Sequence, residues 1–327
     1  MSTKNLFLMV MNVLIVQTTV FSQETEKKQA SLSYDFSFAE LAIQYLETGK
    51  TEYLYEISNL EATTHIFNHA LNFNDGMPTD SKLELVTYLL SPIDKQRELL
   101  PYFKRNLKFA KESLVETGAV EKITLEFLPE DFTFSGSLFF TFGYDIGVAF
   151  GQNSSLNLAH SIFSNNMNEI KYWAIHELHH AGFIMLKGGY MPSLDMTTYK
   201  EMAHVVAYLT HLEGMGTYVP LGIREQENAM NTHQDYVAIQ DLELLKELEK
   251  EYFDIYFHFK NNPDSLIAEA DWDKINILSD AKRLWYIVGA HIAQTIDRKL
   301  GREKLINLIS ESSENFITTY LELKSAE

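Results

Sequence analysis

Residues 172–183 read YWAIHELHHAGF and place three histidines and one glutamate within five consecutive positions. If this stretch is helical, His176 and His180 lie one turn apart and point the same way, as two ligands of one ion must. Glu177 then lies about 100° around the helix from His176, close enough to hold a water at the metal without binding the metal itself. An H-E-x-x-H motif on a helix is typical of zinc with a general-base carboxylate, and chance would supply it roughly 0.03 times in a chain of this composition.

The residues around the motif favour a helix. Asn166-x-x-Glu169 has the spacing of a capping box and predicts a helix start just before Ile170. Two glycines directly after Lys187 predict the end of that helix. The alternative to a metal site is a buried polar cluster whose members are satisfied by their neighbours.

The third histidine of the motif, His179, is harder to assign. It lies on the other side of the His176/His180 pair from Glu177, so a site of three histidines stays open. Adjacent helical residues diverge by about 100°, however, so His179 and His180 do not easily converge on one ion. We expect His179 to support the ligands or to face the substrate, with a plain surface histidine as the alternative.

A catalytic zinc needs a third protein ligand and an open position. The extended form of the motif, with another histidine six residues after His180, is absent, so the ligand must come from another element. The next helical stretch, residues 199–220, offers Glu201 and Glu213. We favour Glu213, because it lies among apolar positions and a buried carboxylate needs a partner. Glu201 fits equally well as an acid in the first turn of a helix.

The pattern along the chain predicts an α+β fold that is predominantly α-helical. Helical spacing runs from Phe36 to about Gly118 and resumes after Asn165. Between them lie KITLEFLP, FTFSGSLFFTF, IGVAF and SSLNLAHS, which are rich in β-branched and aromatic residues and predict a small sheet. We expect a helical region over residues 23–120 packed on a core over residues 121–327.

The first residues have the features of an export signal. Lys4 precedes an apolar run over residues 6–16 that is too short to span a membrane comfortably, which predicts a signal peptide over residues 1–22. The expected location is secreted or periplasmic, and an uncleaved N-terminal anchor is the alternative.

Composition excludes several other classes of protein. The chain has no cysteine, which excludes disulfides, a lipid-attachment cysteine and thiolate ligands. Its 45 Asp and Glu exceed its 27 Lys and Arg, so its field repels nucleic acid and anionic lipid. We expect neither a nucleic-acid partner nor stable membrane association after signal cleavage. The oligomeric state is not predicted.

HELHH followed by LEGMGTY (212–218) resembles the gluzincin clan of metallopeptidases, and more narrowly an uncharacterised family of secreted bacterial zinc-dependent peptidases. The resemblance covers about residues 145–220, with a weaker echo over residues 284–296. It implies a zincin-like core, Zn²⁺ as cofactor and a peptide or protein substrate. It also implies His176, His180 and Glu213 as ligands and Glu177 as catalytic base. The chain departs from thermolysin-like members by a longer spacing and by lacking their E-x-x-x-D.

Peptide hydrolysis further needs a donor for the developing oxyanion. The candidates are Tyr218, Tyr286, His291 and His211, of which we select Tyr286. The stretch SSLNLAHS, if it is an edge strand, would pair with an extended substrate; otherwise it is simply the last strand of the sheet. Alternative functions are zinc-dependent hydrolysis of another amide or ester, and a non-catalytic metal-binding scaffold. The presence of Glu177 argues against a scaffold, since closed structural sites have four protein ligands and no poised carboxylate.

Overall fold

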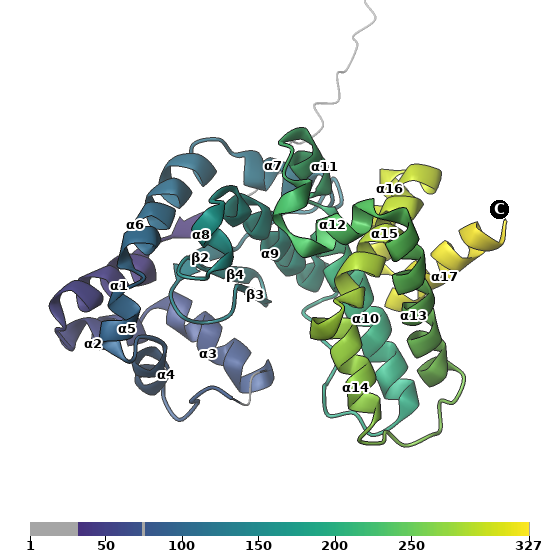
Figure 1. The fold of residues 1–327 in the computed structure, drawn as a ribbon, viewed down its shortest axis with the longest axis horizontal. Coiled ribbons are helices and arrows are strands. Elements are labelled where there is room, and N and C mark those ends of the chain that lie inside the picture. Colours follow the sequence, from purple (N-terminus) through teal and green to yellow (C-terminus); the bar gives the residue numbers. More distant parts are fainter. Residues whose placement is uncertain (1–31, 74–75, 327) are drawn as a thin grey trace, which may run out of the picture.

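The computed structural model describes residues 32–73 and 76–326 (Figure 1). The expected signal peptide lies outside these residues. Helices dominate the described part and surround one four-stranded sheet, which confirms the predominantly helical α+β fold. The division of the chain at residue 120 stays a prediction.

The elements before the motif helix are β1 (Ser33–Asp35), α1 (Ser37–Thr48), α2 (Glu52–Ser58), α3 (Glu61–Phe73), α4 (Lys82–Leu89), α5 (Ile93–Arg97), α6 (Leu100–Phe109), the π-helix η1 (Ala110–Leu114), α7 (Ala119–Leu125), β2 (Ser137–Thr141), β3 (Gly147–Phe150), β4 (Asn153–Asn157) and α8 (Ile162–Asn165). Those that follow are α9 (Asn168–Leu186), α10 (Tyr199–Tyr218), α11 (Leu221–Gln226), the 3₁₀ turn η2 (Met230–Thr232), α12 (Gln234–Gln240), α13 (Leu242–Lys260), α14 (Asp271–Asn276), the π-helix η3 (Ile277–Ala281), α15 (Leu284–Leu300), α16 (Arg302–Ser310) and α17 (Ser313–Ser325).

The sheet has the strand order β1-β2-β4-β3. β1, β2 and β4 run parallel, whereas β3 is antiparallel to β4, with Val148 opposite Ser155. The interpretation of SSLNLAHS as an edge strand is therefore wrong. The tight hairpin through Gly151, whose φ is 63°, turns β4 back between β3 and β2, and β3 becomes the edge. β1 was not predicted, because three residues are too few to show alternation.

The predicted strand KITLEFLP is also wrong, because these residues begin inside helix α7 and continue as turns. Gly118, at a φ of 59°, directly precedes the helix, and α7 then buries Val120 and Thr124 as it packs against α9. Contacts across the helix face outweigh the strand preference of β-branched residues.

The motif helix α9 lies between the sheet and the C-terminal helices and is buried on almost every side (Figure 1). The predicted capping box does not form. The helix begins at Asn168, and the Glu169 carboxylate instead receives two hydrogen bonds, of 2.6 and 2.8 Å, from the Arg224 guanidinium. This buried ion pair ties the first turn of α9 to α11, so the beginning of α9 is fixed by a tertiary contact.

α10 and α15 form the most extensive helix pair in the C-terminal half. They cross at Gly214 and Gly289, where a Cβ on Gly214 would lie 2.4 Å from the carbonyl carbon of Gly289. Only two glycines allow the backbones to approach this closely. The first turn of α15 lies close to the middle of α9, where the ring of Tyr286 stacks on that of His176.

Among the described residues, no helix is both long and apolar enough to cross a membrane.

Candidate active site

Two histidines of α9 and one glutamate of α10 converge. Nε2 of His180 lies 3.0 Å, and Nε2 of His176 3.3 Å, from the same carboxylate oxygen of Glu213. The three candidate ligand atoms all lie within 4.8 Å of one another. Two imidazole nitrogens and one carboxylate oxygen on the wall of a cleft match the donor set of a catalytic zinc with an open position. These residues therefore fit zinc.

Charge and burial act in opposite directions on this cluster. Burial opposes ionisation of Glu213, but the two imidazoles outweigh it and hold the pKa of Glu213 well below its usual range. Burial, and then the neighbouring His180, lower the pKa of His176 to about 4, against the opposing pull of Glu213. The result is an ionised carboxylate beside neutral His176, and metal ligands are bound in these forms.

Gly216 lets α10 approach the two histidines. A Cβ on Gly216 would lie 2.5 Å from Cε1 of His180 and 2.9 Å from Cε1 of His176. Real Cβ atoms essentially never come this close to ring atoms, so any side chain here would push the imidazoles away from Glu213. The glycine is part of what shapes the site.

Glu177 lies against the edge strand. A Cβ on Gly147 of β3 would lie 2.8 Å from Oε1 of Glu177, so only a glycine leaves room for this carboxyl group. The Ser154 hydroxyl donates a 2.7 Å hydrogen bond to the Glu177 carbonyl and fixes the helix to the sheet. Burial raises the pKa of Glu177 well above its usual value, and the carboxylates of Glu213 and Asp145 raise it further. Such a group is suited to accept a proton and then release it.

Glu201 is not part of the cluster. Thr198 caps α10, and the Glu201 carboxylate accepts 2.9 Å hydrogen bonds from the backbone N–H groups of Thr197 and Thr198. This reciprocal capping box engages Glu201 at the helix start. Of the two candidate ligands, the fold brings Glu213 to the histidines.

A cleft of about 360 Å³ opens beside the cluster. Its lining includes Gly147, Val148 and Ala149 of the edge strand. It also includes apolar residues from the end of α9, the following loop and α10: Ile184, Met191, Pro192, Leu194, Leu209 and Leu212. Strand edge, cluster and apolar wall thus share one space.

Of the four oxyanion candidates, Tyr286 alone lines this cleft. Its ring stacks on His176, with centroids 6.3 Å apart and planes 16° from parallel. Tyr218 instead donates a 2.6 Å hydrogen bond to Asp297, and His211 is buried in a stack on Phe316. His291 packs against the ring of Tyr320.

His179 is fully buried and does not line the cleft, so neither the surface nor the substrate-facing interpretation holds. The centroid of its ring lies 6.5 Å from that of Phe183, one turn further along α9. Burial, followed by the nearby imidazoles of His180 and His176, lowers its pKa to about 3. His179 is therefore neutral at ordinary pH.

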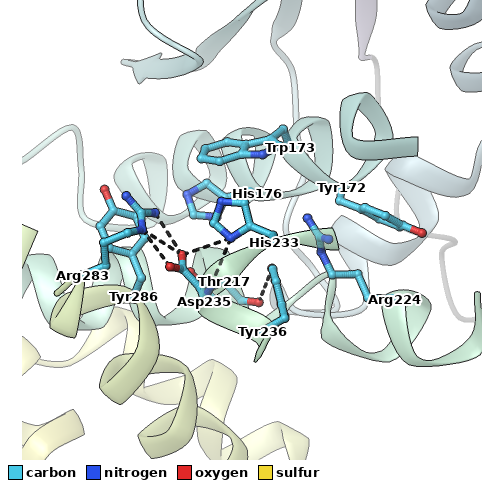
Figure 2. Close-up of a pocket in the computed structure, with 10 residues that line it drawn as sticks. All are labelled: Tyr172, Trp173, His176, Thr217, Arg224, His233, Asp235, Tyr236, Arg283 and Tyr286. Carbon is cyan, nitrogen blue, oxygen red and sulfur yellow. Dashed lines mark hydrogen bonds and ion pairs between the residues drawn. The ribbon is translucent and has the colours of Figure 1, made fainter. Parts of the chain in front are cut away.

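Sequence reasoning missed two residues on the far side of His176, Asp235 and Arg283. Figure 2 shows that both line a small cavity there, together with the predicted Tyr286. Arg283 also lines the main cleft. The one available signal was the spacing of Arg283 and Tyr286, which puts them one turn apart at the start of α15.

The fold is α+β and predominantly helical, and two histidines and one glutamate form a group that could hold a metal ion. Residues 46–325 match the model of a family described as "Putative zinc dependent peptidase (DUF5700)", and the chain belongs to this family. Its cofactor is zinc. Neither the curated proteins nor the solved structures include a match to this chain.

Proposed function

We propose that this protein is an exported zinc-dependent peptidase in which His176, His180 and Glu213 hold the metal. The observation that carries the proposal is the convergence of these three ligand atoms beside the buried carboxyl group of Glu177. The family description supports peptide or protein substrates. Export rests on the apolar run over residues 6–16 and its flanks.

When bound, zinc supplies Lewis-acid activation of a water and of the scissile carbonyl. Glu177 accepts a proton from the attacking water and delivers it to the leaving amine. Its raised pKa suits both halves of this transfer. Tyr286, on the cleft wall beside His176, donates its hydroxyl proton in a hydrogen bond to the developing oxyanion.

The edge strand supports an extended peptide as substrate. The Asn157 N–H of β4 donates a 3.0 Å hydrogen bond to the carbonyl of Ile146, directly before β3. The alternation of an antiparallel ladder then directs Val148 toward β4 as well. The peptide groups of Gly147 and Ala149 consequently face away from β4, along the cleft. An extended substrate can pair with them by strand addition.

The test is hydrolysis of a mixed peptide library by the purified zinc-loaded protein. Glu177→Gln should lower kcat by at least about 100-fold because it removes the base. Zinc stoichiometry should not change, because Glu177 is not a ligand. A chelator should abolish activity, and added zinc should restore it.

Three results would contradict the proposal. Stoichiometric zinc without peptide cleavage would favour a scaffold. Cleavage of other amides or esters, with peptides untouched, would assign a different hydrolase. Full activity of Glu177→Gln would remove the proposed base.

A further inference from the structure

The segment that leads into α15 has an unusual backbone. The π-helix η3 ends at Ala281, and Arg283 then adopts φ 53° and ψ 42°, the left-handed region that L side chains rarely occupy. A non-glycine residue in this conformation is strained and persists only when its surroundings enforce it. The contacts of the Arg283 side chain therefore explain why its backbone keeps this conformation.

Asp235 holds the guanidinium in place. Nε of Arg283 donates to both carboxylate oxygens of Asp235 at 2.8 and 3.0 Å, and an Nη donates at 3.0 Å. Asp235 is 2% exposed and Arg283 is largely buried, so water does not weaken this pair much. The fork fixes both the plane and the position of the guanidinium.

The guanidinium then lies on Tyr286. Its central carbon is 3.8 Å from the ring centroid of Tyr286, and that ring stacks in turn on His176 (Figure 2). The order is cation, phenol ring, imidazole. Among the described residues that line the cleft, Arg283 is the one Arg or Lys, whereas Asp145, Glu177, Glu213 and Asp280 contribute carboxylates.

We propose that Arg283 is a positioning residue for Tyr286, an inference that rests on the proposed function. Its fixed plane restricts the rotation of the phenol ring, and its charge over the ring polarises the hydroxyl group toward proton donation. Tyr286 thereby donates a stronger hydrogen bond to the oxyanion than an isolated tyrosine would. Asp235 balances the charge, so that Arg283 does not repel a divalent cation at the nearby ligands.

A double-mutant cycle tests this inference. Arg283→Met should lower kcat about 10- to 100-fold with KM changed less than about threefold, because the lost interaction acts in the transition state. Tyr286→Phe should lower kcat by at least as much. The double variant should be no slower than Tyr286→Phe alone, because Arg283 acts through the hydroxyl group. Arg283→Lys should recover only part of the activity, since an ammonium group keeps the charge but not the planar stack.

Arg302→Met is the matched control. The Arg302 guanidinium lies 3.6 Å from the ring centroid of Phe127 and pairs with Asp297, but it does not line the cleft. The Arg302→Met substitution should leave kcat unchanged. Zinc affinity and thermal unfolding, measured for each variant, separate a lost fold or lost metal from a lost interaction.

Several outcomes would overturn the inference. If the effects of Arg283→Met and Tyr286→Phe multiply, Arg283 does not act through Tyr286. If Arg283→Met raises KM for free-acid peptides but not for their C-terminal amides, Arg283 binds a substrate carboxylate instead. If Arg283→Met and Arg283→Lys lose only stability, the contact is a structural clamp. Glu177→Gln is assayed beside the wild type. If the wild-type protein cleaves no more peptide than Glu177→Gln does, the proposed function is refuted, and this inference with it.

Discussion

Helix α10 carries two glutamates in two different environments, at its first turn and near its end. Glu201 is exposed and accepts hydrogen bonds from backbone N–H groups, whereas Glu213 is largely buried and faces two imidazoles. Both carboxyl groups have a lowered pKa, to about 2 for Glu201, because backbone donors stabilise its charge, and further for Glu213. A lowered pKa therefore does not identify a ligand. The partners do: backbone donors are satisfied by one carboxylate, while converging imidazoles leave room for an ion.

The largest expected effect is on zinc affinity, when each of these two glutamates is replaced in turn. Glu213→Ala should weaken zinc binding by more than about 100-fold, because it removes a ligand, whereas changes to residues that only orient ligands cost 10- to 100-fold. Glu201→Ala should leave zinc affinity unchanged. Competition with a chromophoric chelator measures both. Loss of zinc in Glu201→Ala with none in Glu213→Ala would reverse the assignment.

The end of α10 also shows how much of the site sequence could predict. The spacing of His176 and His180 follows from helix geometry alone, and the burial expected of Glu213 follows from its apolar neighbours. Both were predicted, and the fold brings these three residues together. The approach of Arg283 depends on the crossing of α10 and α15 and on a rare backbone conformation, neither of which leaves a periodic pattern.

The errors in the fold have a similar cause. The first half of KITLEFLP lies in α7 because burial against α9 outweighs local preference. The Glu169 carboxylate pairs with Arg224 and does not cap its own helix. The order of the strands depends on the hairpin at Gly151, so the edge could not be assigned before pairing was known. Local pattern predicted the kinds of element in most places, and tertiary contacts decided the exceptions.

Gly216, three residues after Glu213 in α10, offers a test with a smaller expected effect on zinc affinity. Gly216→Ala should weaken zinc binding about tenfold, because the new methyl group displaces His180 and His176 without removing a ligand. Gly222→Ala in α11 is the control, since nothing lies within 4 Å of its Cβ. Both substitutions favour helix formation, so helix propensity does not explain a difference. Equal zinc affinity of the two variants would show that the histidines move aside at no cost.

At the other end of the helix, the expected effect is on stability. Thr198→Ala removes the hydroxyl group that accepts from the Glu201 backbone N–H, and should lower the free energy of unfolding by about 1 kcal/mol. Zinc affinity should not change, since the cap lies at the opposite end of α10 from Glu213. Urea unfolding of the metal-free protein measures the free energy of unfolding, and competition with a chelator measures zinc affinity. A loss of zinc affinity would mean that the whole helix moves when its first turn frays.

The smallest effect concerns the pH dependence of that cap. Hydrogen bonds from Thr197 and Thr198 lower the pKa of Glu201 from 4.5 to about 2, so the folded state binds its proton less readily than the unfolded state. The stabilisation by Glu201 is therefore complete above about pH 4.5 and is lost as the pH falls toward 2. The difference in urea midpoint between wild type and Glu201→Gln should be constant from pH 7 to 5 and shrink between pH 4.5 and 3. The measurement uses chelator-treated protein, so that metal release does not contribute. A difference that stays constant down to pH 3 would mean that the carboxylate charge of Glu201 does not stabilise the start of α10.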